Sequence, residues 1–176
     1  YFEANDGTHG NELWRTNGTS TTRVTDINVG AGNSYPWELT AFGGYLYFTA
    51  DDGTEGNELW RTDGSTTTRV ADIRVGAVGS NPYYITAFGS YLYFGADNGT
   101  DGFELWRTDG STTTRIADIN VGAGASSPLG LTPFGEFLYF RADDGSSGNE
   151  LWRTDGTAPG TTRVMDINTT TGSRNP

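Results

Sequence analysis

Aspartates stand beside glycine at a recurring position along the chain, and such carboxylates can bind a cation. The candidate ligands are Asp51, Asp52, Asp97, Asp143 and Asp144. Ca²⁺ prefers oxygen ligands and takes about six to eight of them. Neither the EF-hand spacing nor the glycine-rich nonapeptide of calcium-binding β-rolls is present, so turn formation by Asp-Gly and Asn-Gly is the favoured interpretation. Ca²⁺ is kept as the alternative.

A second set of acids recurs at a constant interval of 46 residues: Glu12, Glu58, Glu104 and Glu150. An aspartate follows each of them later in the repeat, at Asp26, Asp72, Asp118 and Asp166. A pair of carboxylates could act as the acid and base of a glycosidase. Catalytic groups usually break repeat symmetry, whereas these recur with it. We therefore expect structural hydrogen-bond acceptors that tie loops to strands, with Arg61 or Arg69 as partners of Glu58. No catalytic residue is predicted.

Other reactive residue types are scarce. His9 is the only histidine and cysteine is absent, which leaves too few ligands for a zinc site. Asn17, Asn98 and Asn168 fit the N-glycosylation acceptor pattern, although a turn role explains Asn17 and Asn98 without sugar. The aromatic residues Trp37, Tyr83 and Tyr84 follow prolines at the repeat boundaries and are candidate ligand contacts.

A tandem repeat must position these residues. The string ELWRTNG occupies residues 12–18, and ELWRTDG returns at 58–64, 104–110 and 150–156. The expected organisation is a partial repeat lacking its first strand at 1–35, complete repeats at 36–81 and 82–127, and a last segment at 128–176. That segment carries a two-residue insertion and the start of a further repeat. A constant period of this length indicates a solenoid, a propeller or an array.

Each repeat reads as four short strands. In the unit 36–81 the predicted strands cover 39–42, 45–50, 58–62 and 68–73, and Gly43-Gly44 predicts a hairpin turn. Apolar side chains alternate to both faces in 45–48, which predicts sheets that are buried on both sides. The sequence therefore predicts an all-β fold of four-stranded antiparallel units, similar to propeller blades, in a ring or an extended array. Pro133 is expected to be unpaired or to lie at a sheet edge.

The repeated Glu-Leu-Trp-x-x-Asp-Gly-Thr string resembles the ELWxxDGT repeat family of secreted and surface-attached bacterial proteins. The match spans essentially the whole chain: Thr19 and Thr157 complete the string, Ser65 and Ser111 replace its Thr, and Asn17 replaces its Asp. The resemblance implies extracellular, propeller-like β-repeats and carries over no catalytic residues. WD40 propellers match less well because the Gly-His and Trp-Asp dipeptides are missing.

Charge narrows the classes of partner. The net charge is −11, and all 11 basic residues are arginine. Such a field repels nucleic acid and anionic lipid surfaces, so neither is expected as a partner. No apolar run is long enough to span a membrane. The absence of cysteine leaves the question of secretion open.

These observations favour a non-enzymatic extracellular β-repeat protein with a structural or adhesive role in a longer array or fibre-like assembly. Its expected partners are copies of itself or further repeats. The alternative is a ligand-binding propeller that recognises glycans or proteins through its loops. Because Tyr1-Phe2 corresponds to the middle of a second strand, we expect neighbouring chain to supply the missing first strand.

Overall fold

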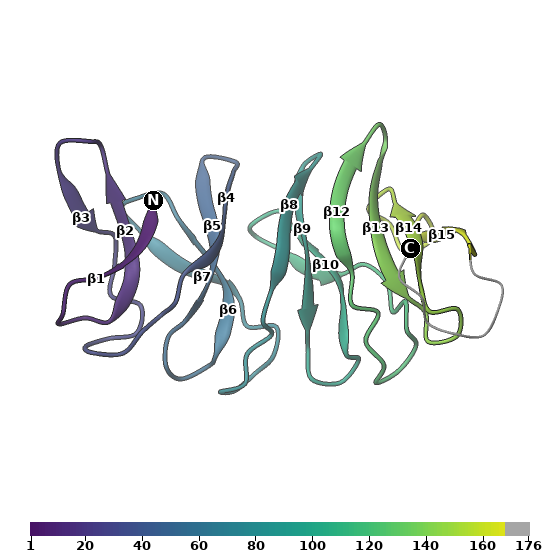
Figure 1. The fold of residues 1–176 in the computed structure, drawn as a ribbon, viewed down its shortest axis with the longest axis horizontal. Helices are drawn as coiled ribbons and strands as arrows, with labels where there is room; N and C mark the ends of the chain where they lie inside the picture. The colour runs from purple at the N-terminus through teal and green to yellow at the C-terminus, as the bar shows by residue number, and fades with distance from the viewer. Residues whose placement is uncertain (168–176) are drawn as a thin grey trace. The chain divides into compact units, whose positions relative to one another are not determined.

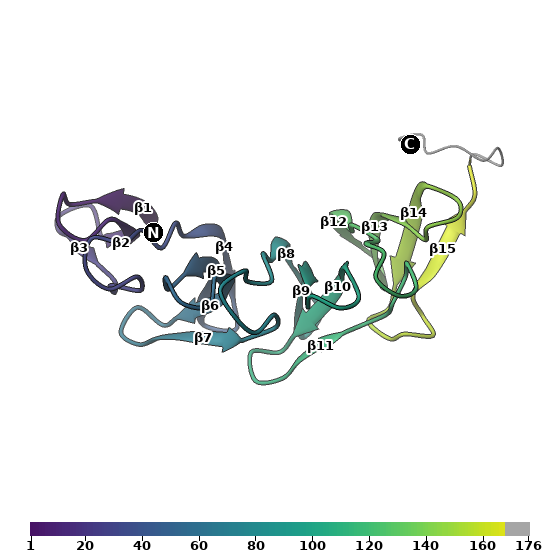
Figure 2. The same cartoon turned by 90° about the horizontal axis from the view of Figure 1, so that it is seen from below.

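The computed structural model describes residues 1–167, and every regular element in that range is a β-strand (Figure 1). The strands form four antiparallel sheets, each made of strands that follow one another in the chain (Figure 2). The first sheet contains β1 (Phe2–Asn5), β2 (Asn11–Thr16) and β3 (Thr21–Arg23). The second contains β4 (Trp37–Phe42), β5 (Tyr45–Asp51), β6 (Asn57–Thr62) and β7 (Thr67–Ala71).

The remaining two sheets repeat the plan of the second. The third contains β8 (Tyr83–Phe88), β9 (Tyr91–Asp97), β10 (Phe103–Thr108) and β11 (Thr113–Arg115). The fourth contains β12 (Leu129–Phe134), β13 (Phe137–Asp143), β14 (Asn149–Thr154) and β15 (Thr162–Met165). The predicted all-β fold of repeated antiparallel units is therefore confirmed, with four strands in three of the sheets and three in the first.

Glycine and one unforeseen bulge shape the first hairpin of each complete sheet. Gly43 and Gly44 have φ angles of 57° and 83°, as a tight turn between β4 and β5 requires. The pairing of β4 with β5 shifts between Trp37 and Thr40, and Glu38 at this bulge has a φ of 56°. β4 consequently begins at Trp37, two residues before the predicted start, because the bulge lets the strand continue past its irregular residue.

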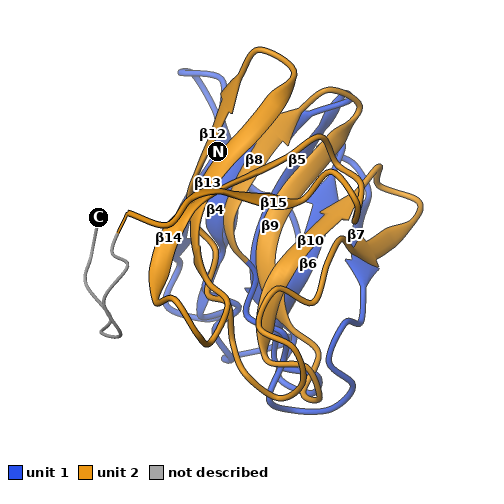
Figure 3. Ribbon diagram, turned by 90° about the vertical axis from the view of Figure 1, so that its right-hand side faces the viewer, with its two compact units in different colours: residues 1–82 blue, residues 83–176 orange. Residues whose placement is uncertain are grey.

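The chain divides into two compact units, residues 1–82 and 83–176 (Figure 3). In the first unit, Leu13 and Ile27 of the first repeat pack with Phe48 and Ala50 of β5. In the second unit the corresponding cluster joins the third and fourth sheets. Its buried members are Tyr93, Leu105, Ile116, Ile119, Leu131, Leu138, Phe140 and Ala142.

Two further sequence predictions are met in these sheets. Tyr47 and Phe48 are neighbours in β5, so they point to opposite faces, and their exposed fractions are 2% and 0%. Burial on both faces is thus confirmed for the centre of this strand. Pro133 lies in β12, which is an edge strand of the fourth sheet. In the described part of the chain no helix is long and apolar enough to cross a membrane.

Candidate functional site

The carboxylate of Glu58 lies at the second residue of β6 and is completely buried. It accepts hydrogen bonds from the backbone N–H groups of Ile73 and Arg74, both at 3.4 Å. The backbone N–H and the hydroxyl of Ser80 donate to it at 2.7 and 2.5 Å. One side chain therefore ties β6 to the loop after β7 and to the segment that ends the repeat.

The same arrangement, here named the carboxylate node, recurs in the other sheets. Glu12 accepts from the N–H groups of Ile27 and Asn28 and from the hydroxyl of Ser34 at 2.7 Å. The corresponding donors to Glu104 are the N–H groups of Ile119, Asn120 and Ser126 and the Ser126 hydroxyl. Glu150 accepts from the N–H of Ile167 at 3.1 Å. The predicted role as structural acceptors that tie loops to strands is confirmed.

Sequence reasoning missed the serine of the node. In the first three repeats a serine follows the glutamate by 22 residues, at Ser34, Ser80 and Ser126, and all three are fully buried. Serine is common in turns, so this column resembled an ordinary loop position. Its constant separation from the glutamate was the signal available in the sequence.

The expected arginine partners of Glu58 are wrong. Arg69 lies on the edge strand β7 and forms ion pairs with Asp52, Glu55 and Asp72. The guanidinium of Arg61 lies 4.5 Å from the centre of the Tyr45 ring, where a cation–π contact holds it. The buried node is instead satisfied by N–H and O–H donors, which avoids burying a second long charged side chain.

Burial also decides what the node can do chemically. It raises the pKa of Glu58, an effect opposed by the hydrogen bonds from Ser80 and the backbone. The pKa values of Glu12 and Glu104 are raised for the same reason. A raised pKa suits a general acid, but Glu12, Glu58 and Glu104 have no exposed surface through which a substrate could reach them. The arrangement fits structural hydrogen bonding.

The candidate calcium ligands lie at the ends of β5, β9 and β13 and in the turns that follow these strands. Asp51 accepts from the N–H of Gly53 at 2.7 Å, and Asp52 accepts from the N–H groups of Thr54 and Glu55 at 2.9 Å. The equivalent bonds are made by Asp97 to Gly99, by Asp143 to Gly145, and by Asp144 to Ser146 and Ser147. These contacts agree with the favoured turn interpretation.

An arginine side chain forms ion pairs with the acidic residues of these turns. Arg163 lies 3.2 Å from Asp144 and 3.6 Å from Asp166, and Arg115 lies 3.0 Å from Asp101 and 3.4 Å from Asp118. Within residues 1–167, no group of three or more His, Cys, Asp or Glu side chains is arranged to hold a metal ion. The calcium hypothesis therefore gains no support from the geometry of the turns.

Two of the three glycosylation candidates have defined turn contacts. The side-chain oxygen of Asn17 accepts from the N–H groups of Thr19 and Ser20. Asn98 accepts from the N–H of Thr100, and its amide nitrogen donates to Asp101 at 2.7 Å. The amide nitrogen is the atom to which a glycan would be attached, and one of its two hydrogens makes this bond. Asn168 lies outside the described residues.

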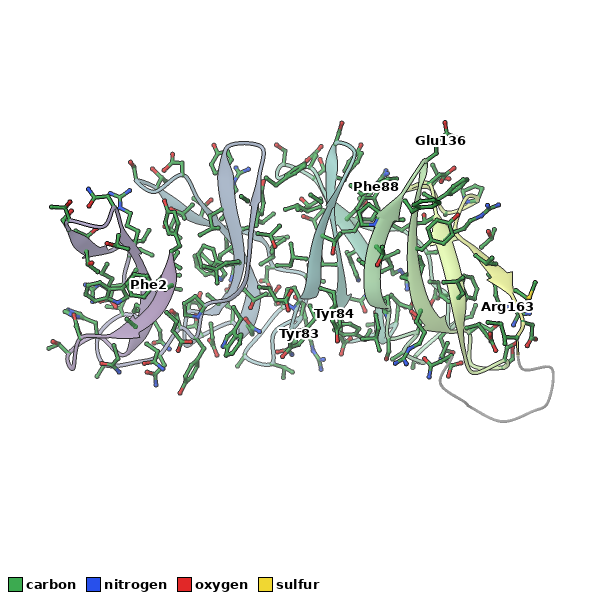
Figure 4. The ribbon with its side chains drawn as sticks, turned by 45° about the horizontal axis from the view of Figure 1, so that its top comes forward. Phe2, Tyr83, Tyr84, Phe88, Glu136 and Arg163 are labelled. Atoms are coloured by element: carbon green, nitrogen blue, oxygen red, sulfur yellow. The ribbon has the colours of Figure 1, made fainter. Side chains whose placement is uncertain are left out.

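The aromatic candidates are exposed, and the second unit brings two of them together. Trp37 of β4 has an exposed fraction of 64%. The rings of Tyr83 and Tyr84 lie 6.4 Å apart at the start of β8, while Phe88 lies at its other end (Figure 4). A pocket of about 280 Å³ opens beside the pair, and we name its lining the aromatic pocket: Tyr83, Tyr84, Phe103, Ser127 and Leu129.

Phe103 is a member of this pocket that the sequence analysis did not select. The other repeats have asparagine at its position. In β9, Gly95 pairs with Leu105, which lies two residues after Phe103, and the residue of β5 that corresponds to Gly95 is Thr49. A Cβ atom at Gly95 would lie 2.3 Å from the Phe103 ring, so the ring needs glycine there. The signal in the sequence was that Phe103 and Gly95 both differ from the residues at the same positions of the other repeats.

Neither a comparison with models of known protein families nor one with curated proteins finds a match for this chain.

Proposed function

We propose that this chain is a non-enzymatic extracellular β-repeat protein with a structural or adhesive role, which assembles with copies of itself or with further repeats. The observation that carries the proposal is that the side chains of the ELWRTDG string at residues 58–64 are engaged in the fold. Glu58 forms the carboxylate node and Leu59 is fully buried. The Trp60 indole donates to the carbonyl of Ala50 at 3.0 Å, and Arg61 stacks on Tyr45.

The last three residues of the string form the turn after β6. The Thr62 hydroxyl donates to the carbonyl of Thr66 and accepts from the N–H of Gly64, both at 3.0 Å. Asp63 accepts from the N–H groups of Ser65 and Thr66, both at 2.7 Å. An enzyme needs polar groups that a substrate can reach, and these are already paired within the repeat.

Exposed apolar columns support assembly. Leu13 and Leu105 are buried against a neighbouring sheet of their own unit, whereas Leu151, at the same position of the repeat, is 37% exposed. Phe48 lies in the same buried cluster as Leu13, and Phe140 lies in the same buried cluster as Leu105. Phe2 occupies the same position of the repeat as Phe48 and Phe140, and it is 37% exposed. The Leu151 face and the Phe2 face thus resemble the two halves of one interface, which a second copy or a further repeat can complete.

Light scattering over a range of concentrations tests this proposal. We expect a mass several times 18.9 kDa that falls when Leu151→Asp places a charge on the exposed face. Val75→Asp is the matched control, because Val75 is 86% exposed in a loop and belongs to neither face. A mass of one chain at every concentration, or an equal effect of both substitutions, would contradict assembly through these faces.

The aromatic pocket favours a second candidate function, recognition of glycans or proteins. Aromatic rings offer flat apolar faces with polar edges, which suit sugar rings and peptide side chains. Binding to a glycan array should then be lost in Phe103→Ala and retained in Trp37→Ala. An array with no bound glycan, or equal loss in both variants, would remove this candidate for glycans.

A further inference from the structure

One wall of the aromatic pocket has residues that the other repeats lack. Phe103 stands where the other repeats have asparagine, at Asn11, Asn57 and Asn149. Gly95 stands where the other repeats have a larger polar residue, at Glu3, Thr49 and Arg141. A Cβ atom at Gly95 would collide with the Phe103 ring, so the ring can lie there only because this residue is glycine. The two differences together place an aromatic ring where the other repeats have polar side chains.

A bulge in β8 brings two more rings to the pocket. The pairing of β8 with β9 shifts between Tyr83 and Thr86, and Tyr84 has a φ of 61°. Neighbours in a regular strand point to opposite faces, whereas a bulge can redirect a side chain. Both tyrosines line this pocket, with ring centres 6.4 Å apart and ring planes inclined by 49° (Figure 4). The corresponding bulges carry Glu38 in β4 and Gly130 in β12, so β8 is the strand that presents two adjacent rings.

The segment that leads into the fourth sheet completes the pocket. The N–H of Ser127 donates to the carbonyl of Phe103 at 3.0 Å, which holds this segment beside β10. Leu129, the first residue of β12, adds an aliphatic side chain to the lining. Tyr83 and Tyr84 are 49% and 42% exposed, so a ligand can reach the pocket from solvent.

The side chains of the lining indicate which chemistry it can bind. Within the described part of the chain, the polar side-chain groups of the lining are three hydroxyls, and it has no carboxylate, amide or cation. A sugar ring carries several hydroxyls, each of which needs a hydrogen-bond partner when it is buried. A trimethylated ammonium group donates no hydrogen bond, and the negative faces of aromatic rings attract it. The lining therefore suits such a cation better than a sugar.

Charge distinguishes among the molecules that carry a methylated ammonium group. Asp97 lies opposite Phe103 across β9 and β10, and Arg141 lies opposite Leu129 across β12 and β13, so the charges next to the pocket have opposite signs. The chain as a whole has a net charge of −11. Its field attracts a cationic protein and repels the phosphate of a phosphocholine group. A trimethylated lysine side chain therefore fits better than phosphocholine.

We propose that the aromatic pocket binds the trimethylated ammonium group of a modified lysine on a partner protein. The rings of Tyr83, Tyr84 and Phe103 contact the methyl groups, and the open side of the pocket admits the aliphatic part of the lysine. This inference rests on the second candidate function, recognition of proteins by the same pocket, and names the group that is recognised. It does not depend on assembly through the Leu151 face.

Titration of the intact chain with N-acetyl-trimethyl-lysine amide, followed by NMR of the backbone amides, tests the site. Saturable shifts are expected at Gly95 and Phe103. The same molecule with a tert-butyl group in place of the trimethylammonium group has the same shape and no charge. It should bind at least about tenfold more weakly, because it forms no cation–π contact. Equal affinity for the two molecules, or no saturable shift, overturns the proposal.

A double variant tests the residues of the pocket without introducing an unfamiliar pair. Phe103→Asn combined with Gly95→Thr restores the pair that the second sheet carries at Asn57 and Thr49. This variant should lose binding of trimethyl-lysine amide. The control Trp37→Ala, which changes an exposed ring outside the pocket, should retain it. Equal binding by the double variant and the parent chain overturns the proposal.

Two more probes separate this inference from the candidate function on which it rests. N-acetyl-lysine amide and phosphocholine should both bind more weakly than trimethyl-lysine amide. If unmodified lysine binds equally well and its binding depends on Phe103, the inference fails while recognition of proteins stands. If no probe requires Phe103, both fail. Tighter binding of phosphocholine than of trimethyl-lysine amide overturns the assignment to a partner protein.

Discussion

At Glu58 a carboxylate without solvent contact is held by N–H and O–H donors from two distant stretches of chain. The carboxylate links these stretches, and its removal would leave several buried donors without a partner. Each unpaired buried donor costs about 1–3 kcal/mol. The energetic importance of the node thus follows from how many groups depend on it.

We therefore predict that Glu58→Ala lowers the free energy of unfolding by about 3 kcal/mol or more. Glu12→Ala and Glu104→Ala should behave similarly, because backbone N–H groups and a serine hydroxyl also donate to these carboxylates. Glu136→Ala is the matched control: this glutamate is exposed in the turn between β12 and β13, and the change should stay within about 0.5 kcal/mol (Figure 4). Urea unfolding measures the free energy of unfolding of the node variants and of the control. A small loss in the node variants would contradict the stabilising role of the carboxylate node.

Stability should also depend on pH in an unusual direction. Burial raises the pKa of Glu58 and Glu104 above the ordinary value of 4.5. Between 4.5 and the raised pKa the folded chain holds protons that the unfolded chain has released, so stability falls as the pH rises through this window. Hydrogen bonds from Thr66 and Ser65 lower the pKa of Asp63 below 3.8, so its contribution is lost as the pH falls below that value.

The free energy of unfolding should accordingly be highest near the two ordinary values, 3.8 and 4.5, and should decline as the pH rises from 4.5 through the raised pKa values of the buried glutamates. Urea unfolding in about 1 M NaCl checks this, because a Debye length of about 3 Å screens the repulsion among exposed acids and leaves the buried carboxylates. A stability that stays constant or increases as the pH rises above 4.5 in that salt would show that burial does not control these groups.

At the scale of the strands, turn chemistry made much of the fold predictable. Gly43-Gly44 and the Asp-Gly pairs fixed the strand limits to within about two residues, because glycine and aspartate favour the backbone angles and hydrogen bonds that turns need. The bulge in β4, β8 and β12 was not predictable in the same way. Its positive φ falls on Glu38 and Tyr84, residue types that rarely adopt it, and only the fourth sheet has glycine there, Gly130.

The contacts of the candidate site also divide into those that local sequence predicts and those that it does not. The turn role of Asp51 and Asp52 could be predicted because it depends on residues two or three positions away. The Ser80 contact with Glu58 could not, because it joins residues 22 apart through the packing of a loop. Long-range contacts of this kind depend on tertiary structure, which local propensity does not contain.

The bulge gives a prediction of its own. Gly130 has a φ of 65°, and a Cβ atom at this position would meet nothing within 4 Å. Gly130→Ala should therefore cost only the backbone penalty of the left-handed region, about 1–2 kcal/mol. Gly130→Asn should cost less, because asparagine tolerates this region better. Thermal unfolding of the two variants compares them, and an equal or greater loss in the asparagine variant would contradict the backbone explanation.

At the scale of the whole chain, several contacts recur from one sheet to another. The Trp60 and Trp106 indoles each donate to an alanine carbonyl at 3.0 Å, and three arginines stack on three rings. The aromatic pocket departs from this pattern at Phe103 and Gly95. Recognition of glycans or proteins is proposed at this pocket, and the regular part of each sheet supplies the scaffold.

Native-state hydrogen exchange, read residue by residue by NMR, tests the central claim most directly. The account predicts that the N–H groups of Ile27, Ile73 and Ile119, which donate to the carboxylate nodes, exchange slowly and alike. Glu58→Gln should accelerate exchange at Ile73 and leave Ile119 slow. Fast exchange at these amides in the parent chain, or no change at Ile73 in the variant, would contradict the claim that the repeated glutamates hold the fold together.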